Sequence, residues 1–416
     1  MSSGDQRDLH RRNEHLTFRA NMGVGRHGWL RLTPAYGVRL VRERIGDLSG
    51  HAVVTDPFSG TGTTPLAAAE LGHFGQSVDV NPFLIWLGTV KTSHYSLDIR
   101  DTLSAVALDV SAQAKSLLPE YDLWKPSLHN IERWWSPGNL RALCAIRAAI
   151  DSLATEPEHR NLLDLALCRT LIARSNAAFD HQSMSFKDSP ATPALFSIDE
   201  SGETLSAFAT EAASLGESAS YDLVGNGKIV QGDSREKMAD LEPCDLLITS
   251  PPYVNRMSYI RELRPYMYWL RFLDVASDAG DLDWKAIGGT WGTATSKLNS
   301  WKPETVIPIE DAMEPVCAKI RADGGKNGPL LATYVHKYFH DMWLHFRSAA
   351  DHVKPGGKAS YIVGNSTFYG HTVPAEQWYA AMMSEAGFET VTVTTIRKRN
   401  SNKALFEYDV AGTKPA

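Results

Sequence analysis

The sequence predicts an α/β fold built on a doubly wound, seven-stranded sheet with a helical insertion. The chain has 416 residues, which is enough for one large domain with insertions or for two domains. Short apolar runs alternate with segments that repeat apolar residues at helical spacing, as in a mostly parallel sheet. One long stretch, residues 96–225, shows the helical pattern and no convincing strand, so we expect it to be inserted into the sheet domain.

Seven apolar segments are expected to form the strands, and the last two of these strands are expected to pair antiparallel. The segments are 51–56, 74–80, 228–233, 245–250, 358–365, 389–396 and 406–412. Helices are expected near 36–47, 64–72, 258–272, 333–353 and 375–386. In the insertion, Ser136 and Pro137 have the order of a helix cap followed by a first-turn proline. Residues 273–329 are rich in Gly, Pro, Trp and Asp, which predicts a loop-rich insertion.

Composition narrows the class of protein. Apolar residues make up 43% of the chain and charged residues 22%, so disorder is excluded as the dominant state. No apolar run approaches the roughly 18 residues that span a bilayer, and the first residues show no secretory signal. The four cysteines form no CxxC pair, which argues against a zinc site and against a disulfide scaffold. We therefore expect a cytoplasmic protein without a membrane segment and without a metal.

The net charge of −6 counts mildly against a nucleic-acid-binding protein, because such proteins are often basic. Basic residues nevertheless gather locally. Residues 1–45 hold nine Arg against four acidic residues, and four further Arg lie in 256–271. A third basic group lies in 397–403. Each group fits either a solvated surface or a contact with DNA.

A glycine-rich segment, Asp56 to Thr64 (DPFSGTGTT), follows the first strand and opens a helix. Gly60 and Gly62 allow a tight turn and a close approach of the backbone to a ligand. Asp79 ends the next strand, where one carboxylate can accept hydrogen bonds from both hydroxyls of a ribose. The segment lacks the third glycine of a dinucleotide site and the lysine of a P-loop, so it suits neither a pyrophosphate nor a triphosphate.

A second motif, Ser250-Pro251-Pro252-Tyr253, follows the strand at 245–250. Two successive prolines stiffen a short extended loop. Such a loop directs the Ser250 hydroxyl and the backbone carbonyls, and it presents Tyr253 as a rigid aromatic plane. These groups can hold a planar base by stacking and accept hydrogen bonds from its exocyclic amine.

Together these motifs resemble motif I and motif IV of the S-adenosylmethionine-dependent amino-DNA methyltransferases, which modify cytosine N4 or adenine N6. The Ser-Pro-Pro-Tyr form is typical of cytosine-N4 enzymes, whereas adenine-N6 enzymes more often carry Asp or Asn at the position of Ser250. Three more segments are similar to other parts of the family: residues 27–36 to motif X, residues 232–235 to the strand end beside the cofactor adenine, and residues 352–357 to a late helix–turn–strand unit.

The resemblance implies the methyltransferase (Rossmann-like) sheet, S-adenosyl-L-methionine as cofactor, and methyl transfer to cytosine N4 of a base flipped out of double-stranded DNA. It implies a site-specific enzyme of a restriction-modification or related defence system, with a cognate restriction endonuclease as partner. The cofactor-binding residues that it implies are Thr33, Pro34, Tyr36, Asp56, Phe58, Gly60, Gly62, Thr63, Thr64, Asp79, Asn81, Asp233 and Ser234. The catalytic residues are Ser250, Pro251, Pro252 and Tyr253, and Asn255 and Tyr259 complete the base pocket.

The same resemblance divides the chain by role. Residues 1–95 are expected to form the cofactor-binding half of the catalytic domain, and residues 226–272 the catalytic half. Residues 330–416 are expected to form the remainder of that domain. The insertion 96–225, together with 254–329, is expected to supply most DNA contacts outside the catalytic pocket.

Three other functions remain open: adenine-N6 methylation by the same machinery, methylation of an RNA base, and a silent DNA-binding partner subunit. The intact motifs argue against the silent subunit. Cytosine-C5 chemistry is excluded, because Cys244 precedes the strand 245–250 instead of following it. His336 and His340 could share a helix face, but Lys337 stands where a metalloprotease needs Glu, so we expect no metal site there.

Overall fold

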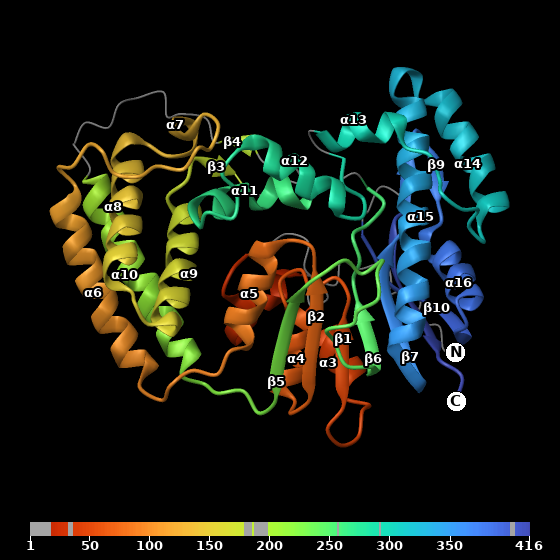
Figure 1. Ribbon diagram of the computed structural model, residues 1–416, viewed down its shortest axis with the longest axis horizontal. Helices are drawn as coiled ribbons and strands as arrows, with labels where there is room; N and C mark the ends of the chain where they lie inside the picture. Colours follow the sequence, from red (N-terminus) through yellow and green to blue (C-terminus); the bar gives the residue numbers. More distant parts are fainter. Residues whose placement is uncertain are drawn as a thin grey trace.

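The computed structural model describes residues 18–31, 36–178, 185–186, 199–255, 258–290, 293–399 and 404–416. Its centre is a seven-stranded sheet in the order β10-β11-β7-β6-β1-β2-β5 (Figure 1). These strands are β1 (Val53–Asp56), β2 (Phe74–Asp79), β5 (Asn226–Gln231), β6 (Cys244–Thr249), β7 (Val353–Gly364), β10 (Glu389–Lys398) and β11 (Phe406–Thr413). β11 runs antiparallel to both of its neighbours, and the other adjacent pairs are parallel. The predicted fold class is confirmed, since each predicted strand segment overlaps one strand of this sheet.

The direction in which the sheet is built reverses between β1 and β6. The chain passes from β1 outward to β2 and β5, and then returns to add β6 and β7 on the other side. Thr55 of β1 lies opposite both Gln76 of β2 and Leu247 of β6, and both pairings are parallel. The ends of these strands therefore lie at one edge of the sheet, at a switch point, where open α/β sheets bind their ligands.

Helices cover both faces of the sheet. Because side chains alternate along a strand, neighbouring residues of β6 pack on opposite faces. Leu246 and Ile248 are buried with residues of α3 and α4, whereas Leu247 is buried with residues of α15 and α16. The helices are α3 (Val38–Ile45), α4 (Thr63–Glu70), α15 (Gly328–His352) and α16 (Ala375–Glu385). Smaller described elements are α2 (Phe18–Asn21), η2 (Gly25–Gly28), η3 (Gly325–Asn327), β8 (Ser366–Phe368) and β9 (His371–Val373).

The insertion 96–225 is a helical block beside the β5 edge of the sheet (Figure 1). Ser136 caps its second long helix by accepting a hydrogen bond from the Asn139 backbone N–H, as predicted. The block also holds a hairpin of two-residue strands that the sequence did not predict. Its elements are α6 (Ile99–Leu117), α7 (Ile131–Trp134), α8 (Pro137–Leu153), α9 (Pro157–Ala173), β3 (Ala177–Ala178), β4 (Ser185–Phe186) and α10 (Glu200–Ala219).

The helical block shares a core with α5 (Pro82–Thr92) and α11 (Tyr259–Trp269). Phe83 of α5 stacks on Tyr266 of α11 with ring centroids 5.4 Å apart. Trp135 of the block meets Trp269 of α11 edge-on at 5.7 Å. The block therefore packs directly on the two helices that flank the carboxyl ends of the strands.

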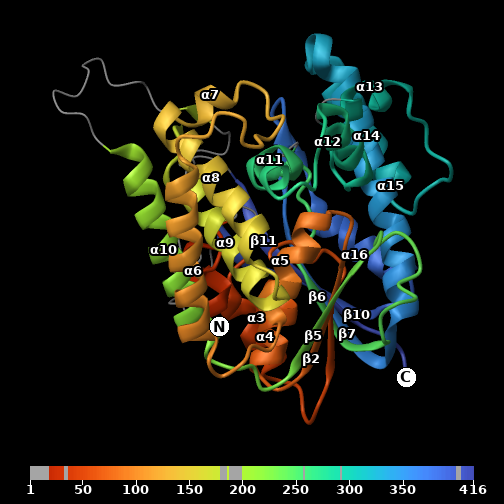
Figure 2. The ribbon, with the colours of Figure 1, turned by 60° about the vertical axis from the view of Figure 1, so that its left-hand side comes forward.

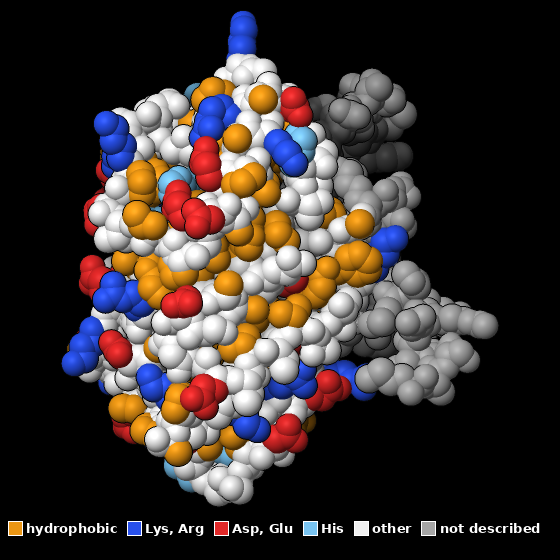
Figure 3. Space-filling view, turned by 90° about the vertical axis from the view of Figure 1, so that its right-hand side faces the viewer, with side chains coloured by type: hydrophobic (Ala, Val, Ile, Leu, Met, Phe, Trp, Pro, Cys, Tyr) orange, Lys and Arg blue, Asp and Glu red, His pale blue; other side chains and the backbone are white. Residues whose placement is uncertain are grey.

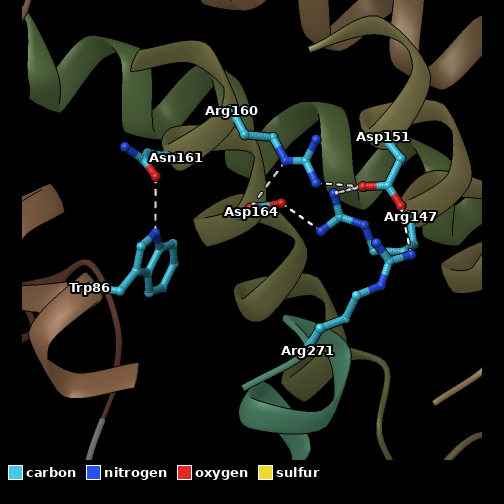
Figure 4. Close-up of polar contacts among 7 residues, drawn as sticks. All are labelled: Trp86, Arg147, Asp151, Arg160, Asn161, Asp164 and Arg271. Atoms are coloured by element: carbon cyan, nitrogen blue, oxygen red, sulfur yellow. Dashed lines mark hydrogen bonds and ion pairs between the residues drawn. The ribbon is translucent and has the colours of Figure 1, made fainter. Parts of the chain in front are cut away.

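An ion network adds to this junction (Figure 4). Arg147 is buried and pairs with Asp164 at 2.6 Å and with Asp151 at 2.8 Å. Arg160 also pairs with both carboxylates. Arg271, which follows α11, reaches Asp151 at 2.9 Å. The network thus joins α8 and α9 to the segment after the Ser-Pro-Pro-Tyr loop.

The loop-rich prediction for 273–329 was wrong, because this segment forms three helices. Met313, Cys317 and Ile320 are buried at helical spacing against α15, and this spacing was the signal that sequence analysis missed. Gly288 and Gly289 lie in the connection between the first two of these helices. The helices are α12 (Ala276–Lys285), α13 (Thr293–Ser300) and α14 (Glu310–Asp323). α11 and α12 lie across the carboxyl ends of the strands, between the helical block and α13–α15 (Figures 1 and 2).

Candidate functional site

A pocket opens at the carboxyl ends of β1, β2, β5 and β6. It holds about 840 Å³ of empty space, counted to its open mouth. Its walls come from the glycine-rich loop, the ends of β2 and β5, the start of α5, the loop after β6, α11, and the segment after α12.

The structure brings together many of the predicted site residues. The predicted residues that line the pocket are Phe58, Gly60, Asp79, Asn81, Asp233, Ser234, Ser250, Pro252 and Tyr259. Those outside its lining are Tyr36, Asp56, Gly62, Thr63, Thr64, Pro251, Tyr253 and Asn255. Thr33 and Pro34 lie outside the described residues. Several lining residues were not predicted from the sequence, among them Leu84 of α5, Lys285 at the end of α12, and Ala286 and Ile287 after it.

Asp79 fixes the glycine-rich loop and the start of α5. One of its carboxylate oxygens accepts from the Gly60 N–H at 3.0 Å, and the other accepts from the Asn81 N–H at 2.9 Å. Gly60 and Gly62 have φ angles of +49° and +73°, which favour glycine. Burial raises the pKa of Asp79 to about 6, although the backbone hydrogen bonds act against this shift. The half-buried carboxylate is therefore mostly ionised at neutral pH, and it faces the pocket.

Asp56 lies beneath the loop and holds it to the neighbouring elements. Its carboxylate accepts hydrogen bonds from the Phe58 N–H at 3.0 Å, the Thr64 hydroxyl at 2.8 Å and the Thr249 hydroxyl at 2.5 Å. The Tyr36 hydroxyl also reaches it, at 3.3 Å. Burial raises the pKa of Asp56 to about 7. This network shapes the loop from below, and direct cofactor contact by its members stays a prediction.

Arg235 joins two walls of the pocket. Its Nε and Nη2 donate to the two oxygens of Asp233 at 2.9 Å and 2.6 Å, and Nη2 also donates to the Lys285 carbonyl at 2.8 Å. Its Nη1 pairs with Asp341 of α15 at 3.2 Å. Burial opposes the shift, but hydrogen bonding and the charge of Arg235 hold the pKa of Asp233 below its ordinary value. Arg235 thus holds the end of α12 against the end of β5.

His345 supports the same wall from inside the fold. Its Nδ1 lies 3.1 Å from the Ser234 carbonyl and its Nε2 lies 2.9 Å from the Tyr361 hydroxyl. Burial lowers the pKa of His345 to about 4, so the ring is neutral at pH 7. The carbonyl requires a donor, which assigns the proton to Nδ1 and makes Nε2 the acceptor. The ring also packs on Phe58, with centroids 4.8 Å apart.

Lys91 of α5 places a buried amine behind the glycine-rich loop. Its Nζ donates to the Thr61 carbonyl at 3.0 Å. Burial lowers the pKa of Lys91 to about 7. The bond holds the Thr61 peptide in one orientation, and Thr61 lines the pocket. Sequence analysis missed α5 because its segment is apolar on nearly every face, which leaves no periodicity to detect.

The Ser-Pro-Pro-Tyr loop is held by tyrosines on both sides. The Tyr338 hydroxyl of α15 donates to the Pro252 carbonyl at 2.6 Å, and the Tyr253 N–H donates to the Tyr259 hydroxyl at 3.4 Å. Pro251 is buried. Ser250 is therefore the hydrogen-bonding side chain of this loop that faces the pocket.

Tyr253 is anchored by the β10–β11 hairpin. Its hydroxyl donates to the buried Glu407 at 2.7 Å, and Arg397 pairs with Glu407 at 2.6 Å. The Arg399 guanidinium carbon lies over the Tyr253 ring, 5.1 Å from its centre. Burial and the charge of Glu407 raise the pKa of Tyr253 well above its ordinary value, so the phenol stays neutral. From the sequence, residues 397–403 were identified only as the third basic group, and no contact with Tyr253 was predicted.

The described part of the chain contains no group of three or more His, Cys, Asp or Glu that could hold a metal ion. Cys244 is buried at the start of β6, at the opposite end of that strand from Ser250. Among the described residues, no helix is both long and apolar enough to cross a membrane.

Comparison with known proteins relates the chain to a methyltransferase. It is 23% identical over 178 residues to the type II methyltransferase M.BsoBI of Geobacillus stearothermophilus. The match covers 38% of this chain and 34% of that relative, so it spans about a third of the relative's length. The rRNA methyltransferase aviRa from Streptomyces viridochromogenes aligns with a TM-score of 0.30 and 12% identity, over 95% of this chain and 92% of that chain. No family model matches the chain.

Proposed function

We propose that the protein transfers a methyl group from S-adenosyl-L-methionine to N4 of a cytosine flipped out of double-stranded DNA. The observation that carries this proposal is the meeting of Asp79, Ser234 and Ser250 in one pocket. Asp79 and Ser234 follow the pattern of a nucleoside-binding site, and Ser250 belongs to a loop that is suited to bind an exocyclic amine. The partial similarity to a type II methyltransferase supports the same class of reaction.

The pocket fits the cofactor's chemistry. Each oxygen of Asp79 accepts one backbone hydrogen bond and keeps a free lone pair for a ribose hydroxyl. Leu84 and Ile260 supply apolar surface for an adenine ring. The pocket-lining Gly60 has φ > 0 and brings the backbone close to the ligand. When bound, S-adenosylmethionine supplies an electrophilic methyl group.

The base amine needs activation, because its lone pair is delocalised into the ring. The Ser250 hydroxyl can accept a hydrogen bond from the amine and draw that N–H out of the ring plane, which localises the lone pair on nitrogen. After the transfer, the methylated amine loses one proton to water. Ser250 faces the pocket, whereas Pro251, whose backbone carbonyl is the other acceptor expected in this loop, is buried outside the pocket lining. Positioning of the amine against the methyl group then supplies much of the rate.

Charge favours one of the two expected DNA-contact regions over the other. The helical block 96–225 contains ten Lys and Arg but eighteen Asp and Glu, whereas the rest of the chain contains 32 and 30. An acidic block repels the phosphate backbone. α11 carries Arg261 and Arg264 beside its pocket-lining residues Ile260 and Leu263. We therefore assign the backbone contacts to 254–329 and the β10–β11 hairpin.

The face on the side of α14, α15 and α16 suits DNA less well. Its Lys and Arg side chains are scattered among Asp and Glu around a band of hydrophobic side chains (Figure 3). This mixture offers no continuous positive surface among the described residues of that face.

The test is methyl transfer from labelled S-adenosylmethionine to double-stranded DNA, single-stranded DNA and RNA, with wild type and Ser250→Ala side by side. We expect label in double-stranded DNA, and a loss of about 10²–10³-fold in kcat for Ser250→Ala, as for the loss of one aligned hydrogen-bonding group elsewhere. Calorimetry should show equal cofactor affinity for both proteins. Label in RNA alone, or cofactor binding without transfer to any nucleic acid, would contradict the proposal.

A further inference from the structure

We propose that Tyr259 is a specificity-determining residue, whose hydroxyl donates a hydrogen bond to the ring nitrogen beside the target amine, N3 in cytosine. This inference rests on the proposed function, and it names the group that reads the edge of the flipped base. Ser250 would accept from the amine, and Tyr259 would donate to the nitrogen next to it.

Tyr259 lies in the same pocket as the loop that would hold the amine. It lines the pocket together with Ser250 and Pro252. Its hydroxyl oxygen is 3.4 Å from the backbone nitrogen of Tyr253, the last residue of that loop. A base whose amine reaches Ser250 therefore shares one enclosed space with the Tyr259 hydroxyl.

The start of α11 holds Tyr259 in place. Tyr259 is the first residue of this helix, and Ser258 is its cap. The Ser258 hydroxyl oxygen accepts from the Arg261 N–H at 3.2 Å, and the hydroxyl donates to the buried Asp283 of α12 at 2.6 Å. The next residue, Ile260, is buried in the core shared with the helical block. A donor at such a fixed position loses little conformational freedom when a ligand binds.

The peptide between Pro252 and Tyr253 sets the direction of the Tyr259 O–H. Its carbonyl accepts from the Tyr338 hydroxyl at 2.6 Å, and its N–H donates to the Tyr259 hydroxyl. A trans peptide directs these two groups to opposite sides, so one tyrosine holds it from α15 and the other from the pocket. Because one lone pair of the Tyr259 oxygen faces the peptide N–H, its own O–H points away from the loop backbone.

The Tyr259 hydroxyl keeps its hydrogen and has an unused donor. Burial raises the pKa of Tyr259 to about 12, although the Tyr253 N–H and the charge of Arg399 act against this shift, so the phenol is neutral at pH 7. No atom of the described residues accepts a hydrogen bond from this O–H, whose oxygen serves only as the acceptor for Tyr253. A polar hydrogen that lies in a pocket and is not used by the fold is available to an acceptor on a ligand.

The edge of the target base carries the matching acceptor. In cytosine the N4 amine is next to N3, which has a lone pair and no hydrogen. In thymine N3 carries a hydrogen, so Tyr259 would meet a donor instead of an acceptor. An acceptor at Ser250 and a donor at Tyr259 therefore fit cytosine and reject thymine. Adenine offers the same pair in its N6 amine and N1, so this contact excludes thymine without separating cytosine from adenine.

The test compares Tyr259→Phe with wild type on two DNA duplexes that differ only at the acceptor atom. Both duplexes carry the site at which the wild type methylates host DNA, and the target is either cytosine or 3-deazacytosine, in which a C–H replaces N3. Single-turnover transfer from labelled S-adenosylmethionine is measured. We expect Tyr259→Phe to be slower than wild type by roughly 5–100-fold on cytosine, because the buried acceptor of the base loses its donor. On 3-deazacytosine the two proteins should react at about the same rate.

This design isolates the contact from other effects of the analogue. Any change that 3-deazacytosine makes to the amine or to the duplex is common to both proteins, so it cancels in the ratio of their rates. The matched control is Tyr266→Phe, which removes a hydroxyl from the same helix but outside the pocket lining, where the ring stacks on Phe83. Tyr266→Phe should match wild type on both duplexes. Calorimetry should show equal cofactor affinity for all three proteins.

Three results would overturn the inference. Tyr259→Phe could match wild type on cytosine. It could be slower by the same factor on both duplexes, which is the result expected if the hydroxyl only supports the loop. Its lower rate could also be accounted for by weaker cofactor binding, which would place the hydroxyl on the cofactor. Failure of the proposed function is distinguishable, because it appears in wild type as cofactor binding without transfer to cytosine in DNA.

Discussion

The Tyr253 hydroxyl donates a 2.7 Å hydrogen bond to Glu407, a residue 154 positions further along the chain. Arg397 holds Glu407 in turn. The aromatic ring of the Ser-Pro-Pro-Tyr loop is therefore fixed at its far end by the last strand of the sheet. In the proposed function, a ring held at both ends is a preorganised stacking surface, which lowers the entropy cost of binding a base.

Two variants of Tyr253 distinguish the contribution of its ring from that of its hydroxyl. Tyr253→Ala should nearly abolish methyl transfer, because stacking is worth roughly 1–3 kcal/mol per base and the ring also positions the amine. Tyr253→Phe keeps the ring and loses only the bond to Glu407, so we expect an intermediate rate. Single-turnover transfer measures both variants, and calorimetry should show unchanged cofactor affinity. Equal rates for Tyr253→Ala and wild type would mean that the base sits elsewhere.

Asp79 should make cofactor binding depend on pH. Asp79→Ala should weaken S-adenosylmethionine binding by about 1.5–3 kcal/mol, the value of hydrogen bonds to a charged group. The pKa of Asp79 is raised to about 6, so the carboxylate is ionised above that pH and becomes protonated below it. Wild-type affinity should hold steady above pH 7 and fall as the pH drops through 6.

Asp79→Asn is the matched control for that titration, since it keeps the size of the side chain and removes the proton uptake. Its cofactor affinity should be weak and flat over the same range. Calorimetry at several pH values measures the cofactor affinity of wild type and Asp79→Asn. An equal pH dependence in wild type and Asp79→Asn would assign the titration to another group, such as Asp56, whose pKa is about 7.

His345 should contribute stability that acid removes. Burial lowers its pKa from 6.5 to about 4, so the unfolded chain takes up a proton before the folded protein does. The contribution of the neutral ring is complete above pH 6.5 and declines as the pH falls toward 4. His345→Gln keeps a donor and an acceptor but does not titrate. Relative to this variant, wild type should lose up to about 1.4 kcal/mol of unfolding free energy per pH unit in that window.

The measurement for His345 is urea unfolding of both proteins between pH 4 and pH 8. Both proteins carry the same carboxylates, so the pH dependence that these groups cause cancels when the two stability curves are subtracted. Parallel curves for the two proteins would show that His345 does not titrate differently on folding.

Much of the fold could be predicted from sequence, because its strands are short apolar runs bounded by turn residues. The meeting of Asp79 and Ser250 could also be predicted, since parallel strands end at one edge of the sheet. The anchoring of Tyr253 by Glu407 could not, because no local pattern links residues so far apart. Nor could the burial of Asp56 beneath the loop, where its motif position suggested ligand contact. The pocket wall formed by the end of α12 and the residues that follow it was not predicted, because residues 273–329 were expected to be loop-rich.

Arg261 tests where DNA lies. It is exposed on α11 beside the pocket, whereas Arg141 is exposed on the acidic helical block. Arg261→Ala should weaken DNA binding and reduce the salt slope by about one, as expected for one lost phosphate contact. Arg141→Ala should change neither quantity. Fluorescence anisotropy across a salt series measures the DNA affinity of both variants. The reverse pattern would indicate that DNA binds to the helical block.

The most direct test of the central claim is the identity of the methylated nucleoside. Unmodified host DNA is incubated with the wild-type protein and isotopically labelled S-adenosylmethionine, digested to nucleosides, and resolved by mass. We predict label in N4-methylcytosine, and none above background when Tyr253→Ala replaces wild type. Label in N6-methyladenine without N4-methylcytosine would contradict the assignment of the base, and unlabelled DNA would contradict the assignment of the reaction.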